Sequence, residues 1–225
     1  MRRAFGGNLS ALFLLSTQFE VQMECTAHPI GITSSKAGMT VMANGEQVLI
    51  VRHWSDRYRH IDLAAIDLSE ANLSGIILRA AHMPRANLTR TRLDHADLAY
   101  AIVSAALARA VVLFGADLSF ANLAQADLTG AILERSCLIQ ADLQAVTLVR
   151  ADLEAADLSE AQLQDADLTN ARLFKAKLNA ANLAGAYLGN ADLRGVDFRK
   201  AIYNHQTVWP KGFQPERCGM VYSDT

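Results

Sequence analysis

A leucine returns at every fifth residue over most of this chain. The stretch ADLEAADLSEAQLQDADLTNARL runs from Ala151 to Leu173, and leucine occupies the third position of each five-residue unit in it. The same phase continues without an insertion from residue 61 to residue 200. These 140 residues form 28 units with the consensus A-(D/N)-L-x-x. The units that lack the central leucine carry Met83, Val103, Ala108 and Phe198 instead.

A period of five excludes an uninterrupted helix or strand. In an α-helix, five residues advance the side-chain direction by about 140° beyond a full turn, so the leucines would spread around the cylinder. In a straight strand, an odd period would send alternate leucines to opposite faces. The pattern becomes coherent if the chain turns a corner once per unit and points Ala and Leu inward. Four corners close a square, so about 20 residues form one coil, and about seven coils at strand spacing make a rod about 34 Å long.

The other consensus positions have roles in such a coil. A small residue two places before each leucine leaves room where four sides converge on one axis. Asp or Asn between them can hydrogen-bond to the backbone of the nearby turn. The sequence therefore predicts an all-β solenoid with a filled interior.

The A-(D/N)-L-x-x units of residues 61–200 resemble the pentapeptide repeat family. This resemblance implies a right-handed quadrilateral β-helix, and the handedness and square cross-section are expected from the resemblance alone. The segment TVWPKGF, residues 207–213, is similar to the terminal segment of many cyanobacterial members.

The flanks of the repeat are expected to cover its two open ends, as solenoids require. Residues 1–42 form a leader to which no structure is assigned. Residues 43–60 are expected to form a capping helix, because Ile50, Val51, Trp54 and Tyr58 follow helical spacing. Residues 201–225 are expected to form an irregular cap.

Aromatic side chains are expected to dominate this C-terminal cap. Tyr203, Trp209 and Phe213 are predicted to cover the last coil. Pro210 and Pro215 are predicted to stop further strand pairing.

Charge and targeting signals favour a cytoplasmic protein. The net charge is −2, with no apolar run of membrane-spanning length, so neither direct nucleic-acid binding nor membrane attachment is expected. Export is the alternative if residues 1–24, which begin MRRAF, act as a signal. Another explanation of this N-terminal segment is that translation starts at Met39 or Met42.

Motifs for catalysis and metal binding are missing from the sequence. It contains no G-x-S-x-G, no phosphate-binding glycine loop and no H-E-x-x-H. The three cysteines lack C-x-x-C spacing, and His82 and His95 are expected on opposite sides of one coil. The chain is predicted to be neither an enzyme nor a cofactor-binding protein.

The consensus breaks in the stretch AIVSAALARAVVLF, where apolar side chains take outward positions. These residues, with one from the next coil, are a candidate surface for an unidentified protein partner: Ile102, Leu107, Val112, Phe114 and Ile132. Coverage by residues 1–41 is one alternative. Another is an internal adjustment, with Ala108 leaving a void and Leu107 turning inward.

Acidic side chains form the second candidate surface. Asp152, Glu154, Asp157 and Glu160 lie in a stretch without bases, and Asp97 and Asp117 start a column that Cys137 and Lys177 interrupt. The resemblance includes proteins that imitate duplex DNA and bind gyrase. Residues 61–200, however, carry 17 acids and 13 bases, few acids for a DNA mimic.

The leading hypothesis is therefore a non-enzymatic binding or scaffold protein that presents the faces of its β-helix to a macromolecular partner. DNA mimicry is the alternative function. A second copy of the chain is also a candidate partner, which would make the protein a homodimer.

Overall fold

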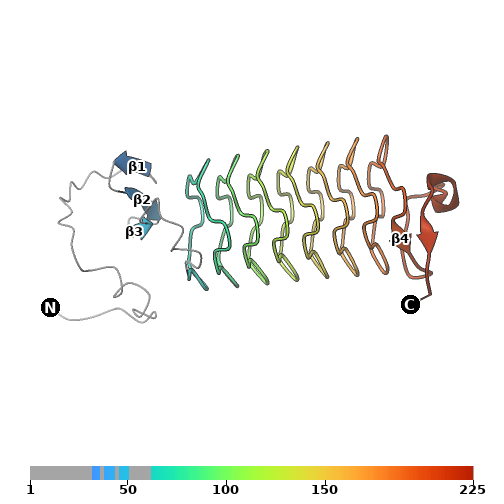
Figure 1. Cartoon of the computed structure of the whole chain (residues 1–225), viewed down its shortest axis with the longest axis horizontal. Coiled ribbons are helices and arrows are strands. Elements are labelled where there is room, and N and C mark those ends of the chain that lie inside the picture. The colour runs from blue at the N-terminus through green and yellow to red at the C-terminus, as the bar shows by residue number, and fades with distance from the viewer. Residues whose placement is uncertain (1–31, 36–37, 44–45, 51–61, 225) are drawn as a thin grey trace.

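The computed structural model describes residues 32–35, 38–43, 46–50 and 62–224. From Asp62 onward the chain is one regular stack of coils (Figure 1). Parallel bridges join residues 20 apart, so Asp62 pairs with His82 and His82 with Ile102. Seven such steps lead from Asp62 to Ile202. The five-residue unit is thus one side of a four-sided coil.

Each corner is a β-turn that opens with the central leucine. The carbonyl of Leu63 accepts a hydrogen bond from the N–H of Ile66 at 3.2 Å, and Ala65 between them has φ of 54°. A positive φ at the third residue of the turn but not at the second defines a type II turn. The last residue of all 28 units has this positive φ, and only five of these residues are glycine.

Hydrogen bonds between coils hold these left-handed corners. A left-handed conformation costs a non-glycine residue about 1–2 kcal/mol. The N–H of most of these residues donates to a carbonyl of the next coil, as Ala65 does to the carbonyl of Pro84 at 2.9 Å. The N–H groups at the second and third positions also donate to neighbouring coils. The fourth residue of the unit is left without a backbone acceptor.

The consensus Asp or Asn supplies that acceptor. The N–H of Ala64 donates to Oδ1 of Asp62 at 3.1 Å, which is an Asx turn. All 15 Asp and Asn residues at this position of the repeat make the same bond. The aspartates are therefore part of the turns.

The core consists of columns of alanine and columns of leucine, one of each on every side of the coil, buried along the axis. Thr91 and Ser136 replace alanine and stay buried, because their hydroxyls donate to the carbonyls of Leu68 and Leu133. Beside Ala108 an apolar cavity of about 10 Å³ remains. It has no polar lining to hold a water. Leu107 is 52% exposed, so the expectation that it turns inward is wrong.

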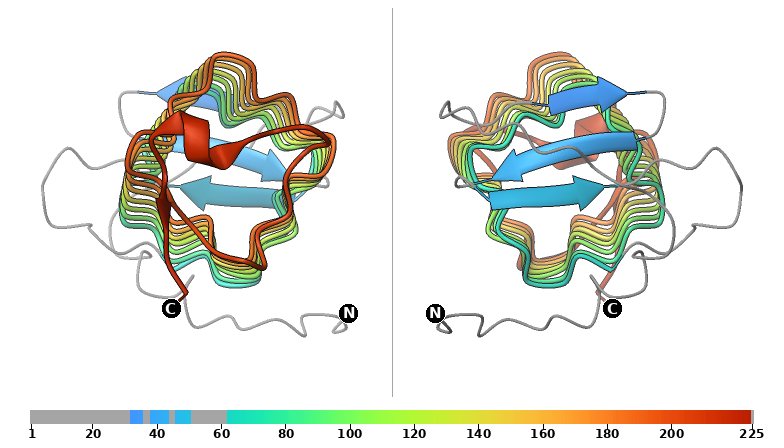
Figure 2. Two further views of the ribbon diagram at one scale, coloured as in Figure 1. Left: turned by 90° about the vertical axis from the view of Figure 1, so that its right-hand side faces the viewer. Right: turned by 90° about the vertical axis from the view of Figure 1, so that its left-hand side faces the viewer.

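The segment before the coils contains a sheet in place of the expected helix. Strands β1 (Ile32–Ser35), β2 (Gly38–Ala43) and β3 (Glu46–Ile50) pair antiparallel in that order. Figure 2 shows this sheet at the N-terminal end of the stack. The helix predicted for residues 43–60 is wrong over β3, and residues 51–60 lie outside the described part.

The reason for this sheet is local. Ala43 pairs with Glu46, and the two residues between them are Asn44 and Gly45. Asn-Gly is the strongest short signal for a hairpin. It outweighs the helical spacing over β3, whereas Val51, Trp54 and Tyr58 lie outside the described residues.

Aromatic side chains cover the last coil at the other end. Phe198, at the final leucine position, is buried, with ring centroids 5.9 Å from Trp209 and 5.6 Å from Phe213. The ring of Tyr203 also contacts Trp209.

One more strand pairs with the stack after Pro210 and Pro215. Pro215 begins the 3₁₀ helix η2 (Pro215–Cys218). Strand β5 (Val221–Tyr222) then pairs in parallel with β4 (Ile202–Tyr203). The prediction that Pro210 and Pro215 end pairing is therefore wrong for this one side of the coil, because β5 follows them.

Removing one leucine from the ladder should test the core. Leu153 is fully buried, so Leu153→Ala should lower the free energy of unfolding by about 2–5 kcal/mol in urea titrations. Gln144→Ala, an exposed control, should change it by less than about 0.5 kcal/mol. Equal effects would contradict a close-packed ladder.

The Asx turn can be tested without changing the core. Asp167 accepts a hydrogen bond from the N–H of Thr169 at 2.9 Å. Asp167→Ala should cost about 0.5–1.5 kcal/mol, because it removes the acceptor. Asp167→Asn keeps an oxygen there and should leave the melting temperature nearly unchanged. If Asp167→Ala and Asp167→Asn lower the melting temperature equally, the charge of Asp167 stabilises the protein and its hydrogen bond to the turn does not.

Candidate functional site

The outward side chains form four columns, because residues 20 apart stack. We name the faces 1 to 4 after the bridge residues of the first coil, which are Asp62, Asp67, Asn72 and Ile77 in that order. The two turn residues that follow each face form the corner of the same number. A surface site on this rod is therefore built from residues whose numbers differ by 20 or by a few.

The predicted apolar surface is divided among three faces. Ile102 lies on face 1, Leu107 on face 2, and Val112 pairs with Ile132 on face 3. Phe114 lies on corner 3. The structure therefore brings together Val112, Ile132 and Phe114, but it places Ile102 and Leu107 on other sides.

Phe114 is already engaged by its neighbours on corner 3. Its ring meets that of His95 edge-on at 5.3 Å between centroids. The guanidinium carbon of Arg135 lies 5.9 Å from the centroid of Phe114. This phenylalanine is half-buried. It is therefore only partly available to a partner.

A second apolar group on corner 4 was missed by the sequence analysis. The rings of Tyr100 and Phe120 stack in parallel at 4.8 Å, and the side chains are 52% and 43% exposed. Ile77 on face 4 and Ile102 on face 1 are also exposed. We call Ile77, Tyr100, Ile102 and Phe120 the aromatic corner. The sequence contains the signal for this stack, because Tyr100 and Phe120 are 20 residues apart, which is the length of one coil.

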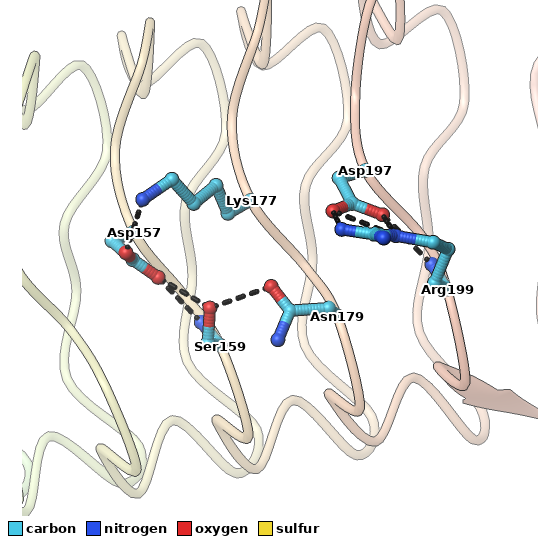
Figure 3. Close-up of polar contacts among 6 residues, drawn as sticks. All are labelled: Asp157, Ser159, Lys177, Asn179, Asp197 and Arg199. Atoms are coloured by element: carbon cyan, nitrogen blue, oxygen red, sulfur yellow. Dashed lines mark hydrogen bonds and ion pairs between the residues drawn. The ribbon is translucent and has the colours of Figure 1, made fainter.

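The predicted acidic column on face 4 is neutralised by bases. Nε of Arg79 lies 3.0 Å from Oδ2 of Asp97, and its Nη2 lies 3.8 Å from Asp117. Nζ of Lys177 lies 2.9 Å from Oδ2 of Asp157, as Figure 3 shows. Partial burial disfavours the charge of Asp157, but hydrogen bonds from Ser159 and Lys177 outweigh it and lower the pKa of this carboxyl.

The remaining predicted acids are also engaged. Arg172 pairs with both Asp152 on face 3 and Glu154 on corner 3. Glu160 on corner 4 accepts a hydrogen bond from Nε2 of Gln140 at 2.6 Å. Asp152 and Glu154 are therefore separated from the face 4 acids, and no continuous acidic stripe results.

Groups for metal binding do not converge in the part of the chain that the structure describes. Residues 62–224 contain no cluster of three His, Cys, Asp or Glu side chains placed to hold a metal. His82 lies on face 1, where its Nδ1 is 3.0 Å from Oδ1 of Asp62, and that hydrogen bond lowers the pKa of Asp62. Cys137 and Cys218 are free thiols, and Cys25 lies outside the described residues. Within the same limits, no helix has the length and apolar character to cross a membrane.

Sequence comparison places the coils in a known family. The pattern described as "Pentapeptide repeats" matches in eight copies, over residues 61–102, 112–148, 136–173 and 176–202. The chain belongs to the pentapeptide repeat family. Members of this family fold as right-handed quadrilateral β-helices, in agreement with the coils described above.

Solved structures of other pentapeptide repeat proteins resemble the chain. HetL, a protein involved in heterocyst differentiation regulation from the cyanobacterium Nostoc sp. strain PCC 7120, is 26% identical with a TM-score of 0.52, covering 73% of this chain and 84% of HetL. The plasmid-mediated fluoroquinolone resistance protein QnrB1 is 15% identical with a TM-score of 0.33, covering 73% and 92%. No protein of curated function matches the chain.

The match to the pentapeptide repeat pattern is interrupted close to the exposed apolar residues Ile102 and Leu107. Residues 103–111 fall between two matched segments. This gap contains Leu107 and Ala108 and directly follows Ile102. The part of the coil that departs from the family pattern is therefore next to the aromatic corner.

Proposed function

We propose that this protein is a non-enzymatic binding protein that contacts a macromolecular partner through its β-helix, with the aromatic corner as the principal contact. The observation that carries the proposal is the exposed parallel stack of Tyr100 and Phe120. Large aromatic side chains are enriched in the central contacts of protein interfaces.

The backbone at these two residues adds to the argument. Tyr100 and Phe120 have φ of 61° and 60°, a conformation in which Gly and Asn are favoured. A tyrosine or phenylalanine therefore does nothing for the turn itself. The guanidinium carbon of Arg79 lies 5.9 Å from the ring centroid of Tyr100. Rings already ordered by stacking lose little conformational entropy when a partner binds.

The similarity to HetL supports a regulatory role for such binding. HetL is a pentapeptide repeat protein involved in the regulation of differentiation, and the similarity covers most of both chains. We propose that the present protein acts by binding a partner and carries out no chemical reaction.

Exchanging the aromatic corner for polar residues should separate binding from folding. Tyr100→Asn with Phe120→Asn should leave the melting temperature unchanged or slightly raised, because Asn tolerates a positive φ. The double variant should lose a partner that the wild type retains in proximity labelling of source cells. Tyr187→Asn, which removes another exposed tyrosine from face 2, is the matched control. The proposal fails if both variants retain the same partners.

DNA mimicry is the alternative function, and the ion pairs of Asp97, Asp152 and Asp157 weigh against it. We expect the purified protein neither to inhibit gyrase supercoiling nor to protect gyrase from fluoroquinolones at micromolar concentration. Inhibition in that assay would favour mimicry over the proposal above.

A further inference from the structure

Charge is distributed unevenly along the coils. Residues 62–167 carry fifteen acids and seven bases, whereas residues 168–224 carry four acids and eight bases. The last part of the stack and its cap are therefore positive on a chain whose net charge is −2.

The cations of this last part also lie on one side of the coils. Six of the eight belong to the coils, and all six lie between face 3 and corner 4. Faces 1 and 2 and their corners carry no Lys or Arg after residue 168. We call the group of eight the basic end: Arg172, Lys175, Lys177, Arg194, Arg199, Lys200, Lys211 and Arg217.

Lys211 and Arg217, the two members of the basic end that belong to the C-terminal cap, extend this side of the coils. Lys211 and Arg194 line one open depression of about 340 Å³, together with Pro210 and Phe213. Arg217 lies in η2, which ends beside corner 4, since the N–H of Lys200 donates to the carbonyl of Gly219 at 2.8 Å.

Half of the basic end is committed to ion pairs within the chain. Arg194 and Arg199 each pair with the aspartate two residues before them, at 2.6 Å. Hydrogen bonds from these guanidinium groups lower the pKa values of Asp192 and Asp197 to about 2, so both pairs persist at neutral pH. Figure 3 shows the pair on face 4. Arg172 and Lys177 pair with acids of the preceding coil.

The other four cations have no such partner. Among residues 62–224, no carboxylate lies within ion-pair distance of Lys175, Lys200, Lys211 or Arg217. Lys175 instead lies over the ring of Phe174, with Nζ 4.9 Å from its centroid. These four side chains are free to meet negative charge from outside the chain.

We propose that the basic end binds an Asp- or Glu-rich segment of a protein partner. The four unpaired cations supply the attraction, and the depression beside Lys211 and Phe213 receives a side chain of that segment. A nucleic acid fits less well, because Asp192 and Asp197 lie among the cations and four free charges are fewer than the six to ten phosphate contacts typical of DNA-binding proteins. This inference extends the proposed binding function but uses a different surface.

A labelled peptide tests the basic end directly. Fluorescence anisotropy with a fluorescein-labelled peptide of alternating Glu and Gly should show binding that weakens as salt rises. Lys200→Gln with Lys211→Gln should weaken it about fivefold, as expected for two partly exposed ion pairs. Arg85→Gln with Arg150→Gln removes the same charge from corners 1 and 2 and should change the affinity less than twofold.

Three results would overturn the inference. They are absence of salt-dependent binding to the Glu peptide, equal loss in the two charge-matched variants, and tighter binding to a DNA oligonucleotide than to the peptide. The Tyr100→Asn, Phe120→Asn protein serves as a second control and should bind the peptide normally. If peptide binding is absent while that variant still loses its cellular partner, the basic-end inference fails and the proposed function stands.

Discussion

The fold depends on one hydrogen-bonded corner, which is repeated in every unit. The turn from the leucine carbonyl to the N–H three residues later requires a positive φ, and most residues that adopt it are not glycine. A single left-handed corner of this kind would be unfavourable in a free chain. In the stack, the N–H of the positive-φ residue donates to the next coil in most units, so the coils stabilise one another's strained turns. This is why the repeat must be long, with the interactions between neighbouring coils giving most of the stability.

The regular corner also explains why the site is a surface and not a pocket. The interior is filled by alanine and leucine, and the cavity beside Ala108 is too small and too apolar for a ligand. Outward side chains are the only ones that vary without disturbing the ladder. Since residues 20 apart become neighbours, exchanges at two such positions create a contact such as the stack of Tyr100 and Phe120.

The coils could be predicted from the sequence because their cause is periodic and local. The inward Leu153 and the turn role of Asp167 follow from position in the unit, and the cover of Trp209 over the last coil follows from the aromatic content of the segment after the repeat. The N-terminal sheet was missed because Asn44 and Gly45 act through only two residues, which helical spacing nearby obscured. Tyr100 and Phe120 were missed because they occupy the last position of the unit, where the consensus sets no residue against which an aromatic side chain would stand out.

The same stacking decides where charge can collect. Asp97 and Asp117 are direct neighbours on face 4, so like charges meet unless a base intervenes, and Arg79 lies within 4 Å of both. Lys177 does the same between Asp157 and Asp197, pairing with the first. A face of unbroken aspartates would have to accept that repulsion in every coil. This chain instead places bases beside its aspartates on face 4, as Arg79 and Lys177 show. These ion pairs therefore prevent the unbroken row of negative charge that an imitation of a uniform polyanion requires.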